Sequence, residues 1–193
     1  MNLEENRDEI KKIIGYVSDT PDLFLKIPAI NYWKFIAQVY NIDESTFNDR
    51  IKHFTEVFNM QDNFNKTIGE FSHGMRQKTF VIGALLSDPK VWILDEPLVG
   101  LDPEAAYNLK ELMKKHAHAG NTVLFSTHVL ETAEQICDRI GIIKNGEIIF
   151  VGTLKELREQ YTGNTLEEIY LNMMNLQKEK SDTEFLDGSE EGV

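Results

Sequence analysis

The sequence holds a single cysteine, Cys137, among its 193 residues. A chain with one cysteine cannot form an intrachain disulfide, which is typical of proteins from a reducing compartment. No apolar run approaches the roughly 18 residues that a membrane-spanning helix needs. The first residues, Met-Asn-Leu-Glu-Glu-Asn, are polar and acidic, unlike a signal peptide. We therefore expect a cytoplasmic protein that reaches a membrane only through other subunits.

Basic residues are also in short supply. The chain has 20 Lys and Arg against 32 Asp and Glu, which gives a formal net charge of −12. A general nucleic-acid binder needs a basic face, so nucleic acid is not an expected partner. The charge does not exclude a nucleotide, because phosphates are met locally by backbone N–H groups and Mg²⁺. The length and a hydrophobic content of 41% predict one globular domain, or one domain and a small subdomain.

The stretch around which the chain is organised is apolar and then acidic. Val91 to Leu94 are apolar, and Asp95 and Glu96 follow them before Pro97. Such a run predicts a strand buried on both faces of a parallel sheet, and Pro97 ends it because it cannot donate to a ladder. Asp95 and Glu96 would then lie at the carboxyl edge of the sheet, where open α/β folds bind ligands. Asp95 could hold Mg²⁺ through water, and Glu96 could orient or deprotonate a water molecule; a strand end with two solvated acids is the alternative.

Strand and helix patterns alternate along the rest of the chain. Buried strands are predicted over residues 13–17 and 121–126. Apolar stripes at helical spacing predict two helices within residues 31–58, and the first stripe contains Tyr32, Phe35, Ile36, Val39 and Tyr40. Asn145-Gly146 between two apolar runs predicts a hairpin. We therefore predict an α/β fold with a mostly parallel sheet, an inserted helical subdomain at about residues 22–88, and a C-terminal β-hairpin plus helices. The composition of residues 177–193 predicts an acidic disordered tail.

Three further motifs flank the central stretch. Phe71–Gln77 precedes it, and Gly100–Pro103 and Ser126–His128 follow it. Their order and spacing resemble the nucleotide-binding domain of ATP-binding cassette (ABC) proteins. In that family the corresponding parts are the signature motif, the D-loop and the switch histidine, with the central stretch as the Walker B strand. The resemblance covers roughly residues 12–174, and four motifs in the right order make it specific.

The resemblance implies ATP and Mg²⁺ as cofactors and gives a role to residues at the sheet edge. Glu96 would polarise the attacking water, His128 would hold the γ-phosphate, and Asp95 would bind Mg²⁺ through water. Asp19 stands at the position of the family's Q-loop glutamine, which contacts Mg²⁺. A carboxylate there could also bind Mg²⁺, and an ordinary turn residue is the alternative.

A second group of residues would serve ATP across a dimer of two such domains. Ser72 is a good helix cap, and Gly74 lets a phosphate approach the backbone of a helix whose N–H groups point at it. The family pattern is Leu-Ser-Gly-Gly-Gln, from which Phe71, His73 and Met75 depart. Ser72, His73 and Gly74 are therefore the predicted nucleotide contacts, and Asp102, a cap for the next helix, would also contact the partner domain.

One part of the family pattern is missing. The P-loop, Gly-x-x-x-x-Gly-Lys-Ser/Thr, does not occur, and the chain contains no Gly-Lys pair. This loop and its lysine hold the β- and γ-phosphates. We therefore interpret residues 1–176 as a partial nucleotide-binding domain with a truncated P-loop NTPase-like core. Alone it is expected to bind ATP weakly or not at all and to hydrolyse none.

The predicted function is the ATP-binding subunit of an exporter-type ABC transporter, which couples Mg-ATP binding and hydrolysis to transport through separate membrane-spanning subunits. Its other partner would be a second nucleotide-binding domain, in a homo- or heterodimer. A non-catalytic regulatory or partner-completing protein derived from such a domain is the alternative, which the missing P-loop favours. A ribosome-acting ABC protein fits less well, because two cassettes and basic patches are absent from the sequence. Residues between Asp22 and Trp33 are candidates for the surface that contacts the membrane subunits.

Overall fold

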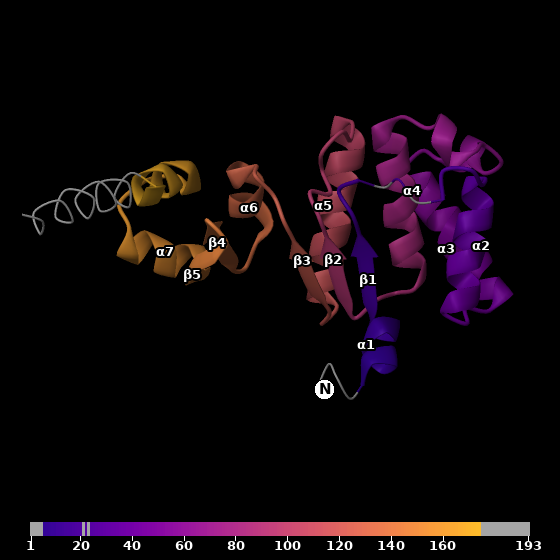
Figure 1. Ribbon diagram of the computed structural model, residues 1–193, viewed down its shortest axis with the longest axis horizontal. Helices are drawn as coiled ribbons and strands as arrows, with labels where there is room; N and C mark the ends of the chain where they lie inside the picture. The colour runs from indigo at the N-terminus through magenta and orange to yellow at the C-terminus, as the bar shows by residue number, and fades with distance from the viewer. Residues whose placement is uncertain (1–5, 21, 23, 175–193) are drawn as a thin grey trace, which may run out of the picture. The chain divides into compact units, whose positions relative to one another are not determined.

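The computed structural model describes residues 6–20, 22 and 24–174 of the chain, which Figure 1 shows as a ribbon. The chain divides into two compact units, residues 1–127 and residues 128–193, and each is described by itself. No helix in the described part of the chain is long and apolar enough to cross a membrane. The predicted tail, residues 177–193, lies outside the described residues.

The first unit is built on a sheet of three parallel strands. These are β1 (Ile14–Val17), β2 (Val91–Leu94) and β3 (Thr122–Phe125), in the order β1-β2-β3. Val17, Leu94 and Phe125 are aligned in the register, so the three strands end at the same edge. The prediction that Val91–Leu94 forms a strand in the middle of a parallel sheet is confirmed, but its predicted burial on both faces is not, because Val91 and Ile93 are only half-buried.

Helices connect the strands. After α1 (Arg7–Ile13) and β1, the chain forms α2 (Ala29–Val39), α3 (Glu44–Val57) and α4 (His73–Leu86) before β2, with two short 3-10 turns at Gln61–Asn63 and Ile68–Glu70. The helix α5 (Pro103–His118) connects β2 to β3. In Figure 1, α4 lies between the strands and the pair α2 and α3. The predicted α/β class, with a helical insertion between the first two strands, is confirmed.

One face of the sheet carries the main core of this unit. Val17, Trp92 and Leu94 point to this face and are at most 1% exposed. The ring of Trp92 meets the ring of His116, in α5, edge-on at a centroid distance of 5.7 Å. A Cβ added to Gly15 would lie 2.8 Å from the side chain of Pro89, just after α4. The helices α4 and α5 therefore cover this face.

The apolar stripe predicted for α2 is partly wrong. Tyr32 is buried, as expected, but Phe35 and Val39 are 45% and 53% exposed, and the buried positions include Trp33 and Ala37 instead. The reason is that α2 packs against α4 through a narrower face than the sequence pattern marks. Tyr32 lies against Phe80 of α4 with ring centroids 4.8 Å apart, so the residues on its flanks stay at the surface.

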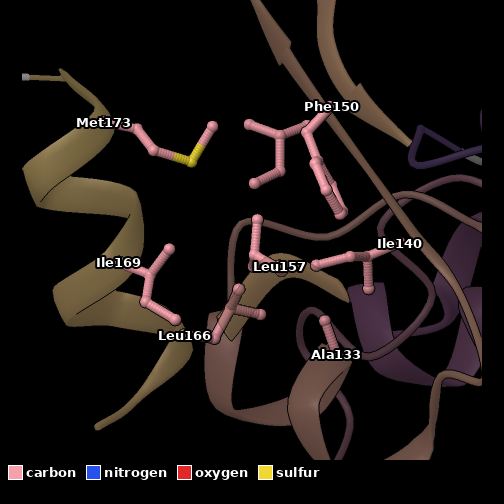
Figure 2. Packing of buried hydrophobic residues seen from close by; sticks show 8 residues of the cluster. Ala133, Ile140, Phe150, Leu157, Leu166, Ile169 and Met173 are labelled. Atoms are coloured by element: carbon pink, nitrogen blue, oxygen red, sulfur yellow. The ribbon is translucent and has the colours of Figure 1, made fainter. Parts of the chain in front are cut away.

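The second unit has its own hydrophobic core. Its elements are α6 (Leu130–Ile136), the antiparallel strands β4 (Ile140–Lys144) and β5 (Glu147–Gly152), α7 (Leu154–Gln160) and helical residues 166–174. The predicted hairpin is confirmed: Asn145 and Gly146 both have positive φ, 51° and 81°, as a two-residue turn of this kind requires. The side chains that meet in the core are drawn in Figure 2, and they include Ala133, Ile140, Phe150, Leu157, Leu166, Ile169 and Met173.

Cys137 packs against the core of the second unit as a half-buried side chain. Burial, and then the nearby charge of Asp138, raises the pKa of the Cys137 thiol to about 11. The thiol is therefore protonated at neutral pH, and Cys137 behaves as a small apolar side chain.

Candidate functional site at the carboxyl edge of the sheet

Two residues extend the hydrogen-bond ladder beyond the three strands. The N–H of Asp95 donates to the carbonyl oxygen of Val17 at 2.9 Å, and the N–H of Ser126 donates to the carbonyl oxygen of Leu94 at 3.0 Å. Asp95 and Ser126 are therefore fixed at the same edge of the sheet by the backbone of the neighbouring strand. This is the edge where parallel α/β folds bind their ligands.

The side chain of Ser126 joins the two carboxylate residues. Its hydroxyl donates to Oδ1 of Asp95 and accepts the backbone N–H of Glu96 at 2.9 Å. One oxygen of Asp95 is thereby held in place, and the carboxylate orientation is set by the end of β3. The sequence analysis did not select Ser126 as a site residue. The available signal was its position directly after β3, as Asp95 is directly after β2.

Glu96 has an unusual backbone conformation. Its φ is +44°, in the left-handed region that residues other than glycine enter at a cost of about 1–2 kcal/mol. The carbonyl oxygen of Glu96 accepts the N–H of Val99 at 3.2 Å, which closes a turn just after the strand. Backbone strain of this kind is concentrated at functional sites.

Asp19 lies two residues beyond the end of β1, at the same edge of the sheet. Its Oδ1 accepts hydrogen bonds from the hydroxyls of Ser18 at 3.2 Å and Thr20 at 3.0 Å. This is local turn chemistry, and a role of Asp19 as a metal ligand stays a prediction.

The carboxylates of Asp19 and Asp95 suit a hard cation such as Mg²⁺, which takes oxygen ligands. Among residues 6–20, 22 and 24–174, no group of three or more His, Cys, Asp and Glu side chains could hold a metal ion. Mg²⁺, however, commonly keeps several waters and is held by one or two carboxylates together with substrate phosphates. The residues at this edge therefore fit a Mg²⁺ ion that arrives with a nucleotide, and do not form an all-protein metal cage.

The predicted nucleotide contacts on α4 form a second cluster. Ser72 caps the helix, and its Oγ accepts the N–H of Met75 at 3.3 Å. A Cβ added to Gly74 would lie 2.3 Å from the carbonyl oxygen of Gly100, and one added to Gly100, at φ +76°, would lie 2.6 Å from the ring of His73. Close packing of these three residues requires both glycines. The approach of a phosphate to Gly74 stays a prediction.

Asp102 connects this cluster to the next helix. Its Oδ1 accepts the N–H of Ala105 at 2.9 Å, so it caps α5 as predicted. Its Oδ2 pairs with Nζ of Lys78, in α4, at 2.7 Å. The hydrogen bond from Lys78, followed by that from Ala105, lowers the pKa of the Asp102 carboxyl. Asp102 thus has a structural role within the chain, and its contact with a partner domain stays a prediction.

Gln77, also on α4, was missed by the sequence analysis. Its side chain is 1% exposed, and neither amide atom has a hydrogen-bond partner among the residues that the structure describes. A buried polar group without partners costs about 1–3 kcal/mol. The signal in the sequence was an amide that falls on the buried side of a helix.

His128 is the first residue of the second unit and lies between β3 and α6. Its predicted approach to Glu96 would cross from one unit to the other and stays a prediction. The structure therefore brings Asp95, Glu96 and Ser126 together at one edge, and Ser72, His73, Gly74, Gly100 and Asp102 together in a cluster at the ends of α4 and α5.

Comparison with known proteins gives the chain its relatives. A family model described as "AAA domain, putative AbiEii toxin, Type IV TA system" matches residues 30–132. The ABC-type transporter ATP-binding protein EcsA of Bacillus subtilis (strain 168) is 36% identical over 171 residues, which cover 88% of this chain and 69% of EcsA. The matches to two further B. subtilis ABC transporter ATP-binding proteins cover 52% and 62% of those relatives. The chain therefore spans only part of their length.

Solved structures agree with these relatives. A structure of an ATP-binding subunit of an ABC transporter matches with a TM-score of 0.84 and 30% identity, over 90% of this chain and 73% of that one. A second structure, cbiO1 from Clostridium perfringens, is described as part of the ABC transporter complex cbiONQ. It matches with a TM-score of 0.63 and 25% identity, over 79% of this chain and 61% of that one.

Proposed function

The chain belongs to the ATP-binding proteins of ABC transporters, and from this premise we propose that it is part of an ATPase subunit that drives transport through separate membrane subunits. The observation that carries the proposal is the Ser126 hydroxyl, which holds Asp95 and the backbone of Glu96 at the carboxyl edge of the central strand. An aspartate carboxylate held at this edge, with a glutamate next to it in the chain, suits the binding of Mg²⁺ and the activation of water.

Each residue at the edge has a proposed task. Asp95 binds Mg²⁺ through water, with Ser126 holding the carboxylate in one orientation. Glu96, in a strained turn at φ +44°, accepts a hydrogen bond from the attacking water and polarises it. His128 holds the γ-phosphate. ATP supplies the transferable phosphoryl group, and Asp19 is a further candidate for the Mg²⁺ shell.

The residues at the start of α4 are proposed to serve a second nucleotide-binding domain. Ser72 and Gly74 begin a helix of 14 residues whose first N–H groups form an anion-binding end. In a dimer, this end faces the ATP held mainly by the other domain, and Asp102 lies at the contact between domains. This arrangement allows one copy to complete the site of another.

Contact with the membrane subunits is proposed at an exposed aromatic pair. Phe24 and Phe35 are 41% and 45% exposed, with ring centroids 5.6 Å apart. Phe24 has a φ of +59°, so its exposed position is held by an unusual backbone conformation. A photo-crosslinker placed at Phe24 in the assembled transporter should capture a membrane subunit, whereas one placed at Glu159 on α7 should not. Equal capture from both positions would remove the proposal for Phe24.

The first test of the ATPase proposal compares the chain with a chimera. In the chimera, the part of EcsA outside the match is joined to the full chain. We expect Mg-ATP to raise the melting temperature of the chimera and leave that of the chain alone unchanged, because a ligand stabilises only the state that binds it. Stabilisation of the chain alone would overturn the expectation that it needs further residues for ATP.

The second test is Glu96→Gln in that chimera. Removing the carboxylate should slow hydrolysis by at least about 100-fold and leave ATP binding in place, because general acid–base groups contribute roughly 10²–10⁴-fold. The control is Glu167→Gln, the same change at an exposed position in the second unit, which should leave turnover unchanged. Unchanged turnover in Glu96→Gln would remove Glu96 from the catalytic role.

A second candidate function is a non-catalytic partner-completing protein. The observation in its favour is that no Gly-x-x-x-x-Gly-Lys-Ser/Thr pattern occurs within the 193 residues, whereas Ser72 and Gly74 are present at the capped start of α4. The discriminating measurement mixes the chain with an intact ABC ATPase relative. A gain in ATPase that is lost in Ser72→Ala supports the second function, and no gain at any ratio removes it.

A further inference from the structure

The hairpin of the second unit turns at an asparagine that is followed directly by a glycine. Asn145 and Gly146 connect β4 to β5, and both are exposed. In the described part of the chain, no hydrogen bond engages the side-chain amide of Asn145 or the backbone N–H of Gly146. A Cβ added to Gly146 would meet nothing within 4 Å. The two groups are therefore open to water and unrestrained by their surroundings.

These neighbouring groups can close a ring. Once a base in the solvent removes the proton of the Gly146 backbone nitrogen, this nitrogen attacks Cγ of Asn145 and forms a cyclic imide. The new N–Cγ bond replaces the bond from Cγ to Nδ2, and ammonia leaves with a proton from the solvent. Water then adds to one of the two imide carbonyls. Opening of one C–N bond gives aspartate, and opening of the other gives isoaspartate, in which the main chain passes through Cβ and Cγ.

Glycine at position 146 removes a steric obstacle to this attack. A Cβ on the residue that supplies the nitrogen crowds the approach, and a β-branched side chain crowds it further. Asn145 is the only asparagine of the sequence that precedes a glycine. Asn164 is also exposed, but it precedes Thr165, and its backbone N–H donates to Oε2 of Glu168 at 2.7 Å. Asn164 is therefore a matched reference within the same unit.

The backbone of the turn already has the sign of φ that the imide needs. Ring closure brings the nitrogen of Gly146 level with Cβ of Asn145 and so sets ψ of Asn145 to about −120°, which with its φ of +51° is the first central position of a type II′ turn. Type II′ turns also form two-residue hairpin loops. Only the peptide plane between residues 145 and 146 has to rotate, while Lys144 and Glu147 stay paired. The hairpin therefore permits ring closure without separation of its strands.

We propose that Asn145 is a site of spontaneous deamidation in the folded protein, which converts it through a cyclic imide with Gly146 into aspartate and isoaspartate. The reaction needs water and base, and no cofactor, oxidant or reductant. It replaces a neutral amide by a carboxylate, so it makes the formal net charge of −12 more negative by one. The proposal does not depend on the ATPase function, because it concerns the tip of the hairpin alone.

Isoaspartate at this position alters the hairpin more than aspartate does. It adds one carbon to the main chain within a loop whose length sets the register of the strands. In that register Ile142 pairs with Phe150, and both side chains are buried in the core of the second unit. A longer loop therefore weakens the pairing that supports this core, and the hairpin of the modified chain should open locally more readily.

The test follows the native full chain during incubation at neutral and at mildly alkaline pH. Peptide mapping by mass spectrometry should show that Asn145 gains the mass difference between an amide and an acid at least about ten times faster than Asn164. The conversion should be faster at the alkaline pH, because base removes the proton from the attacking nitrogen. Methyl transfer from S-adenosylmethionine by an isoaspartyl methyltransferase then identifies isoaspartate in the same peptide. Mapping by peptide keeps this signal apart from Asp187-Gly188, which can form the same imide.

A chain unfolded in urea separates the effect of the turn from that of the sequence. The native rate at Asn145 should lie within about tenfold of the rate in the unfolded chain, because the turn keeps both groups free and holds a positive φ. Asn145→Gln should slow the conversion at this position at least about tenfold, since the longer side chain has to close a larger ring with more rotatable bonds to fix. Asn164→Gln, the same change at the reference position, should leave the rate at Asn145 unchanged.

The outcomes decide both parts of the proposal. If the native chain keeps its amide while the unfolded chain loses it, the turn protects the pair and the proposal is wrong. Equal conversion at Asn145 and Asn164 contradicts it as well. Hydrogen exchange tests the consequence: amides of residues 140–152 in the converted chain should exchange at least about tenfold faster than in Asn145→Gln incubated in the same way. Unchanged exchange would overturn the proposed effect on the hairpin.

Discussion

The two faces of the sheet in the first unit are made from the same three strands and have opposite surroundings. On one face, Trp92 and Leu94 are 0% and 1% exposed under α4 and α5. On the other, Tyr16 and Leu124 are each 60% exposed. Backbone pairing is common to both faces, so the difference comes from the helices alone. Strand order and strand ends are shared by the two faces, so the contrast lies in what packs against each of them.

This contrast shows which features of the candidate site are supported by the covered face of the sheet. The edge geometry of Asp95, Glu96 and Ser126 follows from the ladder and from the core on the covered face. On the opposite face, Tyr16 and Leu124 stay largely exposed.

The comparison is tested most directly by making the same substitution, leucine to alanine, on each face of the sheet. Leu94→Ala should lower the free energy of unfolding by about 2–5 kcal/mol, because it removes a fully buried side chain and leaves a cavity. Leu124→Ala should cost less than about 1 kcal/mol, since most of that side chain is already in water. Urea unfolding followed by tryptophan fluorescence measures both, because Trp33 and Trp92 both lie buried in the first unit. Equal costs of the two changes would mean that the two faces are not different in solution.

A smaller effect is expected where the two covering helices meet the turn after β2. Gly74→Ala should destabilise the first unit by about 1–3 kcal/mol, because overpacking forces the backbone to move. The new Cβ would lie 2.3 Å from the carbonyl oxygen of Gly100. This loss should exceed the gain of about 1 kcal/mol that alanine gives within a helix. Thermal unfolding by circular dichroism measures the net change.

Gly141→Ala is the control for this prediction. A Cβ at Gly141 would meet nothing closer than 3.9 Å, so stability should be unchanged or slightly raised. If Gly74→Ala were equally neutral, the contact between Gly74 and Gly100 would not be the tight one described, and the glycine at position 74 would be left with its predicted ligand role alone.

Much of the local structure could be predicted from the sequence. The apolar run before Asp95, the cap at Ser72, the cap at Asp102 and the turn at Asn145-Gly146 are local signals, and each is confirmed because short-range chemistry decides it. The prediction could not reach contacts between distant segments. The bond of Ser126 to Asp95 and the pair of Lys78 with Asp102 join residues 31 and 24 positions apart.

The sequence also could not show which apolar residues would stay exposed, and the reason is physical. A helical stripe marks Phe35 and Val39 as buried whether or not a neighbour exists to bury them, and both are at the surface. The apolar strand Thr122–Phe125 likewise reads as interior although it lies at an edge. A sequence records which side chains could be covered, and only the arrangement of elements tells which ones are.

The smallest expected effect concerns the ion pair that ties the two covering helices together. Because Lys78 lowers the pKa of Asp102, the ionised carboxylate stabilises the fold above the ordinary aspartate pKa of about 3.9. That contribution is lost as the pH falls through the lowered pKa. Asp102→Asn keeps a capping side chain and should cost no more than about 1 kcal/mol at pH 7, since Asp102 is 52% exposed and solvent screens the pair.

The direction in which the unfolding free energy changes with pH shows whether the Lys78–Asp102 ion pair is the source of the effect. The difference in unfolding free energy between the native chain and Asp102→Asn should be constant from pH 7 to about pH 5 and shrink below about pH 4. Asp43 and Glu156, whose pKa values are also lowered by hydrogen bonds, contribute equally to both proteins and cancel in the difference. A difference that persisted at low pH would show that the Lys78 pair is not its source, and would assign the effect to the cap on α5.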